Sequence, residues 1–129
     1  MDFFFQVLLT FVVFTVVDLF WLVKVAPKLY RKHIGHLMAD KINRVGALLF
    51  YIVFIVGLVL FVIYPHRDDL LLGVLYGGAF GLVTYATYDL TNLATLKAWP
   101  VTITIIDLVW GTFVTAATSG LVILILGIL

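Results

Sequence analysis

Four long apolar runs joined by short polar connections constrain this chain more than any other feature of its sequence. Each run supplies the roughly 20 residues that a helix needs to cross about 30 Å of hydrocarbon. A segment inside lipid must satisfy its own backbone hydrogen bonds, so the runs are predicted to be helices. The expected fold class is therefore an all-α integral membrane protein, a four-transmembrane-helix bundle forming one domain over residues 1–129. Helices are expected at about residues 3–26, 45–64, 70–94 and 101–127.

The composition excludes several classes of function. Only 12% of the 129 residues are charged, against about 25% in soluble domains, and four spans leave no room for a separate soluble catalytic domain. The chain has no cysteine, which excludes thiolate catalysis and iron–sulfur clusters. It also lacks a metal-ligand motif and a nucleotide-binding loop, so we expect no metal, no cofactor and no nucleic-acid partner.

Charge in the connections predicts the orientation in the membrane. The second connection has Arg67 beside Asp68 and Asp69, and the third has only Lys97. The first connection is far more basic, with Lys24, Lys28, Arg31, Lys32, Lys41 and Arg44. The positive-inside rule makes the first connection cytoplasmic. With four spans, both termini are then expected outside.

The first connection also has helical periodicity. An apolar side is formed by Tyr30, Ile34, Leu37, Met38 and Ile42. This pattern predicts a basic amphipathic helix at the membrane interface, which either docks a headgroup or partner or anchors the topology on anionic lipid. The anchor is favoured because the positive-inside rule alone explains the charge.

Glycines in the third run indicate close helix packing. Gly73, Gly77 and Gly81 recur every four residues, so they form a ridge that a neighbouring helix can approach closely. Packing inside the four-helix bundle is favoured modestly, and a homodimer is the alternative.

Acidic residues inside the apolar runs are the most informative feature for function. The pattern Asp-Leu-x-Trp occurs twice, from Asp18 to Trp21 and from Asp107 to Trp110. A spacing of three puts each carboxylate and its indole on one helix face. At 1.5 Å per residue both carboxylates lie about 9 to 10 Å inside the same membrane boundary.

A third carboxylate, Asp89, lies near that boundary in the third run, with Tyr85 and Asn92 at helical spacings from it. We therefore expect one polar cluster in the cytoplasmic half of the bundle. Its candidate substrate-binding residues are Asp18, Trp21, Tyr85, Tyr88, Asp89, Asn92, Asp107 and Trp110, with Thr91 beside them and Trp99 just outside, in the third connection. No catalytic residue is assigned.

A charged side chain at the middle of a membrane helix costs about 3 kcal/mol on insertion scales, so intramembrane acids indicate function. Three carboxylates so close together cannot all stay ionised without a cation. The nearest candidate partners are Lys24, Arg44 and Lys97. A fully hydrogen-bonded cluster that only fixes helix register is the structural alternative, and function is favoured over it.

Carboxylates beside aromatic rings suit a cation. The leading hypothesis is therefore binding or transport of a small cationic or polar solute, with proton coupling through Asp18, Asp89 and Asp107 left open. The alternatives are a membrane-embedded enzyme that uses the acids as proton donor and acceptor on a lipid or other apolar substrate, or a non-catalytic accessory subunit. Membrane lipids are the other expected partners.

Several motifs also carry a family resemblance. The run from Tyr88 to Lys97, with Trp99-Pro100, the segment Asp18 to Trp21 and the segment Asp107 to Gly111, resembles a family of small four-helix bacterial predicted inner-membrane proteins catalogued as a domain of unknown function. The resemblance covers nearly the whole chain. It implies a multi-pass protein of the bacterial cytoplasmic (inner) membrane, N-out and C-out by the charge rule, and it carries over no established activity.

Overall fold

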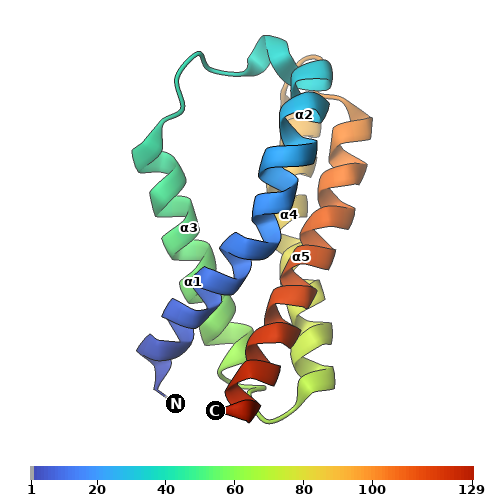
Figure 1. The fold of residues 1–129 in the computed structure, drawn as a ribbon. Helices are drawn as coiled ribbons and strands as arrows, with labels where there is room; N and C mark the ends of the chain where they lie inside the picture. The colour runs from blue at the N-terminus through green and yellow to red at the C-terminus, as the bar shows by residue number, and fades with distance from the viewer. Residues whose placement is uncertain (1) are drawn as a thin grey trace.

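The protein is a bundle of helices, seen in a computed structural model that describes residues 2–129 (Figure 1). Four helical stretches in that range are long and apolar enough to cross a membrane: Phe3–Leu37, Arg44–Ile63, Leu70–Thr95 and Val101–Ile128. The described residues contain no strand. The predicted all-α bundle of four spans is therefore confirmed, and both ends of the chain lie at the same end of the bundle (Figure 1).

The helical stretches are divided into shorter elements. The first consists of α1 (Phe3–Phe20), the π-helical turn η1 (Trp21–Val25), α2 (Ala26–Ile34) and the 3₁₀ turn η2 (Gly35–Leu37). The second consists of α3 (Arg44–Leu58) and the π-helical turn η3 (Val59–Ile63), and the others are α4 (Leu70–Thr95) and α5 (Val101–Ile128). The basic amphipathic helix expected in the first connection is present as α2, and it continues α1 without a break.

Proline accounts for the π-helical turns. Pro27 has no N–H to donate, and its ring crowds the carbonyl of Val23, four residues earlier, so the regular hydrogen-bond ladder cannot pass through η1. The chain inserts a wider turn instead, in which the Ala26 N–H donates to the Trp21 carbonyl. Pro65 stands in the same relation to η3. The bend at η1 places α2 beside the end of α4 and the start of α5 (Figure 1).

The amphipathic helix is shorter than the sequence pattern predicts. Helical structure stops at Leu37, Met38 is extended, and Ile42 is 80% exposed in the connection to α3. The expectation that the apolar side continues through Ile42 on one helix is therefore wrong. Tyr30 and Ile34, in contrast, face the inside of the bundle, where they line a cavity.

The glycine ridge packs against α5 of the same chain. A Cβ atom on Gly77 would come within 2.8 Å of the Ser119 Cβ and 3.0 Å of the Thr115 carbonyl oxygen. Gly73 meets the Ile123 side chain, and Gly81 meets the backbone of α5. The missing side chains thus let α4 and α5 approach closely, which fixes how residues further along both helices face each other.

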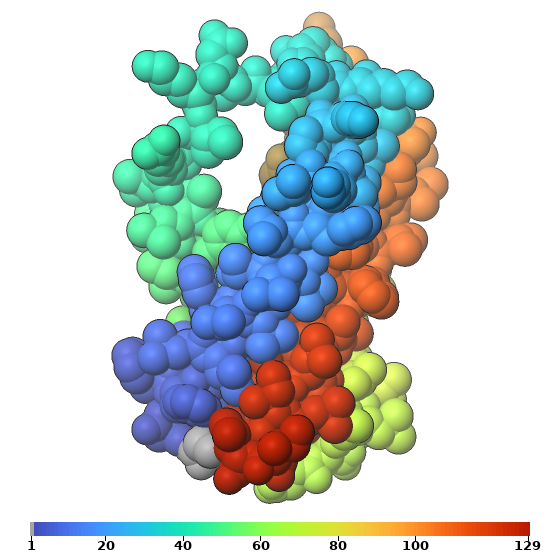
Figure 2. Space-filling model, in the orientation of Figure 1, coloured from blue at the N-terminus to red at the C-terminus, as the bar shows by residue number. Residues whose placement is uncertain are grey.

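The hydrophobic core lies in the half of the bundle near the termini, whereas α3 leaves the bundle in the other half. The core includes Phe14, Phe54, Leu58, Val114 and Val122, drawn from α1, α3 and α5. Every residue from His36 to Phe50 is exposed. The second half of α3 therefore packs on the bundle and its first half stands apart from α1 and α2, with a hollow between them in Figure 2.

The third connection contains a strained residue. Ala98 has a φ of 61°, and no other described non-glycine residue has a positive φ. Replacing Ala98 by glycine removes a steric penalty of about 1 kcal/mol or more, so we expect Ala98→Gly to raise the thermal unfolding midpoint in detergent. Ala94→Gly, in the last turn of α4, is the matched control and is expected to lower it. A decrease with both variants would contradict this interpretation.

Candidate functional site

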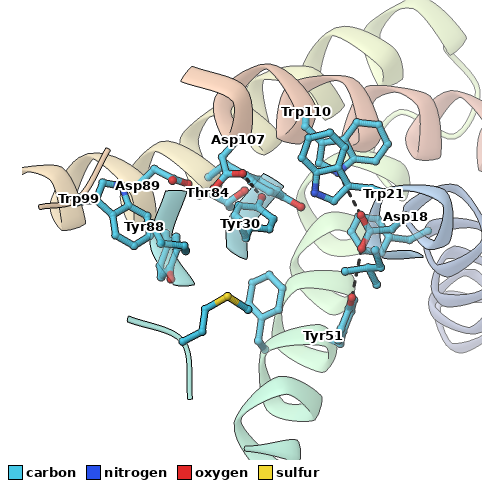
Figure 3. Close-up of a pocket in the computed structure, with 16 residues that line it drawn as sticks. Asp18, Trp21, Tyr30, Tyr51, Thr84, Tyr88, Asp89, Trp99, Asp107 and Trp110 are labelled. Atoms are coloured by element: carbon cyan, nitrogen blue, oxygen red, sulfur yellow. Dashed lines mark hydrogen bonds between the residues drawn. The ribbon is translucent and has the colours of Figure 1, made fainter. Parts of the chain in front are cut away.

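A cavity of about 540 Å³ lies in the half of the bundle opposite the termini (Figure 3). Residues of α1, η1, α2, α3, α4 and α5 line it. These residues include seven of the eight predicted binding residues: Asp18, Trp21, Tyr85, Tyr88, Asp89, Asp107 and Trp110. The eighth, Asn92, is half-buried outside the cavity. Thr91 is also outside it, because its hydroxyl turns back to donate to the Tyr88 carbonyl at 2.9 Å.

The two Asp-Leu-x-Trp segments meet across α1 and α5. Trp110 Nε1 donates to one oxygen of Asp18 at 3.1 Å, and the Tyr51 hydroxyl donates to the other at 3.3 Å. The rings of Trp21 and Trp110 stack with their centroids 4.6 Å apart and an interplanar angle of 9°. The indole of the second segment therefore bonds the carboxylate of the first, and Asp18 is held by two donors.

Asp107 accepts a hydrogen bond from a residue of α2. The Tyr30 hydroxyl donates to one of its oxygens, and the Tyr30 ring lies edge-on to Trp21 at 6.4 Å. Tyr30 reaches this position because α2 continues α1 past the π-helical turn and lies beside the first turns of α5 (Figure 1). The amphipathic helix thus contributes directly to the carboxylate cluster.

Asp89 has the least satisfied environment of the three acids. It is 0% exposed, and no hydroxyl, amide or basic donor reaches its carboxylate oxygens, so that only the carboxyl group of Asp107 is within hydrogen-bonding reach of them. Its neighbour is Asp107, with which it interacts electrostatically. Figure 3 shows these two carboxyl groups side by side and Asp18 further away, beyond the stacked tryptophans. The predicted single cluster is therefore divided into a pair and a separate acid.

Among residues 2–129, no basic side chain compensates these acids. The sequence indicated Lys24, Arg44 and Lys97 as the nearest partners, but all three are exposed and none of them lines the cavity that Asp18, Asp89 and Asp107 share. Long basic side chains near helix ends extend to the water interface, which explains the difference. The cavity wall thus holds three carboxyl groups without a protein cation.

Sequence reasoning missed the aromatic residues that complete the walls. From the sequence, Tyr30 was assigned to the apolar side of an interfacial helix. Phe50 and Tyr51 were not distinguished from the other residues of the second apolar run. Trp99 was placed just outside the cluster, but it is buried, its Nε1 donates to the Thr104 hydroxyl at 3.1 Å, and its ring lines the cavity. The remaining linings are Phe14, Leu22, Ile34, Met38 and Thr84.

The cluster does not have the geometry of a metal centre. Within residues 2–129 no three His, Cys, Asp or Glu side chains come together in a way that could hold a metal ion. His33 and His36 lie outside the cavity lining, and the Nδ1 of His33 is 2.9 Å from the carbonyl oxygen of Leu29, in its own helix.

The cavity opens sideways, beside α3. Four of its lining residues are also well exposed and form the rim of the opening: Leu22, Met38, Phe50 and Tyr88, between 46% and 60% exposed. The adjoining part of α3 exposes apolar side chains such as Val45, Leu48 and Leu49, which is the composition of a surface in contact with lipid tails. The opening is thus bordered by exposed apolar side chains, and Figure 2 shows a hollow beside the first half of α3.

The fold and the cavity define a small four-span membrane protein with a carboxylate and aromatic site inside the bundle. The chain belongs to the family described as Predicted membrane protein (DUF2177), whose family model matches residues 3–124. This result confirms the resemblance found in the sequence, and the function of the family is unknown. Searches of curated proteins and of solved structures found no match to this chain.

Proposed function

We propose that the cavity binds a small organic cation, or the cationic group of a larger molecule. The observation that carries the proposal is Asp89, a fully buried carboxyl group in the cavity wall whose only hydrogen-bonding neighbour is another acid, Asp107. An ionised carboxylate in that position is costly unless a proton or a cation compensates it. A bound cation beside Asp89 and Asp107 would supply this compensation.

The aromatic walls support the same choice of ligand. Trp21 and Trp110 stack against each other at the cavity, and Tyr88 and Trp99 lie edge-on to each other at 5.9 Å on another wall. Indole and phenol rings attract cations, most strongly where water is excluded. The pairing of unsatisfied carboxyl groups with ring faces therefore favours a cation over an anion or a purely apolar ligand.

The proposal is for binding, with the site in the cytoplasmic half of a bacterial inner membrane. The basic residues of α2 and the connection after it support that orientation through the positive-inside rule. Phe14 and the core beneath it close the cavity on the side of the termini. Transport would require this core to open, and proton coupling through the acids would then accompany that rearrangement.

A membrane-embedded enzyme is the second candidate, and the sideways opening and the neighbouring Asp89 and Asp107 favour it. Two neighbouring carboxyl groups can serve as proton donor and acceptor toward a substrate from the lipid. In that case purified protein would change the composition of its bound lipids with time, as measured by mass spectrometry, and Asp107→Asn would not. Unchanged lipids with the native protein would exclude this candidate.

Intrinsic fluorescence provides the binding test, because all three tryptophans of the chain, Trp21, Trp99 and Trp110, line the cavity. We expect choline to change their emission in detergent-solubilised protein. Its uncharged isostere, 3,3-dimethyl-1-butanol, should bind at least about tenfold more weakly, equivalent to about 1.4 kcal/mol. Equal affinity for the two probes, or no response to choline, would contradict the proposal.

A further inference from the structure

The position of the opening restricts how a ligand reaches the carboxyl groups. Phe50, on the rim, is six residues from Arg44 at the start of α3, so it lies about 9 Å deeper than that charged residue. Between them α3 exposes mostly apolar side chains. A molecule that crosses the rim at Phe50 therefore arrives from the lipid tails, whereas Met38, in the polar connection before Arg44, marks the part of the rim nearer the interface.

The cavity also has two chemically different sides. Its inner wall, on α4 and α5, has the neighbouring acids Asp89 and Asp107, and no protein cation compensates Asp89. Its rim and outer wall have Leu22, Met38 and Phe50, which are apolar and about half exposed. A ligand that matches both sides has a cationic head and an apolar body.

We propose that the ligand is a single-chain cationic amphiphile that reaches the site from within the bilayer. Its ammonium group binds at Asp89 and Asp107, and its chain passes over Phe50 beside α3 and remains in the lipid. This inference rests on the proposed function, because it names the class of cation that the cavity takes and the path by which it arrives.

Chain length separates a side-open site from an enclosed one. In an enclosed cavity the chain must fit inside, so affinity stops increasing once the space is full. In a side-open site the chain stays in lipid. The apparent affinity, relative to the free ion in water, therefore continues to rise with each methylene that is transferred from water to lipid. At about 0.8 kcal/mol per methylene, this rise is about fourfold per carbon.

The test uses alkyltrimethylammonium ions with chains of about 4 to 12 carbons, added to protein in phosphatidylcholine nanodiscs, with tryptophan fluorescence as the readout. We expect the apparent affinity to rise about fourfold per carbon over the whole series. Asp89→Asn should weaken every member by the same factor, because the head contacts do not depend on the chain. A plateau or a fall in affinity at short chain length would overturn the inference.

A second measurement locates the chain. Bromine atoms quench tryptophan fluorescence only at short range, so a 12-carbon ammonium ion brominated near its head should quench the three cavity tryptophans. The same ion brominated at the chain end should quench them much less. Equal quenching would mean that the chain folds into the cavity, and the inference would be wrong.

Failure of this inference is distinguishable from failure of the proposed function. If choline binds but longer chains bind no better, the site takes a soluble cation and only the amphiphile is wrong. If neither choline nor any alkyltrimethylammonium ion binds in an Asp89-dependent way, the cation site itself is wrong.

Discussion

Gly81→Val is expected to destabilise the bundle by about 3 kcal/mol and to leave little folded protein in the membrane. A Cβ atom at this position would lie 2.6 Å from the Thr115 hydroxyl oxygen and against the carbonyl oxygen of Gly111. Backbone cannot move aside as a flexible side chain can, so α4 and α5 must separate. The thermal unfolding midpoint in detergent and the yield of monodisperse protein measure the effect.

Gly78→Ala is the matched control, three residues away on the same helix. A Cβ atom on Gly78 would lie 3.6 Å from Ala116 and Thr112, which is an ordinary van der Waals distance. Since alanine favours helix over glycine by about 1 kcal/mol, this variant should be as stable as the native protein or more stable. Equal loss of stability in Gly78→Ala and Gly81→Val would show that the ridge does not act through its contact with α5.

Asp89→Asn is expected to lower the affinity for cations by about 100-fold, because truncating or neutralising one partner of a buried charge pair costs about 2 to 5 kcal/mol. The same change should not lower stability. Asparagine has nearly the shape of aspartate, carries no charge and can donate to the neighbouring carboxyl group of Asp107. Choline binding by fluorescence and thermal unfolding, measured on the same preparation, test both parts.

The combination of the two readouts separates a binding role from a structural one. If Asp89 only fixed helix register, its substitution would lower the stability of the protein and leave the affinity for choline unchanged. Asp68→Asn, in the exposed second connection, is the control and should change neither quantity. Native choline affinity in Asp89→Asn would therefore remove the principal support for the cation site.

The sequence predicted the spans and most of the carboxylate cavity because an apolar segment that crosses a membrane must satisfy its own backbone hydrogen bonds. Lipid makes each run helical, and helical spacing then puts Asp18 beside Trp21 and Asp107 beside Trp110. The matched depth of these acids in antiparallel helices follows from chain length alone. For the same reason the glycine ridge could be recognised without knowing which helix it meets.

The remaining features depend on contacts between distant segments, which spacing within one helix does not encode. Tyr30 and Tyr51 reach Asp107 and Asp18 from other helices, and Asn92 has the correct spacing but lies outside the cavity. The pairing expected between acids and nearby basic residues was wrong because those side chains reach water. The outward path of α3, which leaves the cavity open beside that helix, is likewise a property of tertiary packing.

The most direct test of the cation site is a crystal structure of the protein in a lipidic phase with tetramethylarsonium, whose arsenic atom gives an anomalous signal. We expect one strong anomalous peak in the cavity, beside the carboxyl groups of Asp89 and Asp107 and within reach of the stacked rings of Trp21 and Trp110. A cavity filled by side chains, or a peak only at the surface of the protein, would contradict the proposed site.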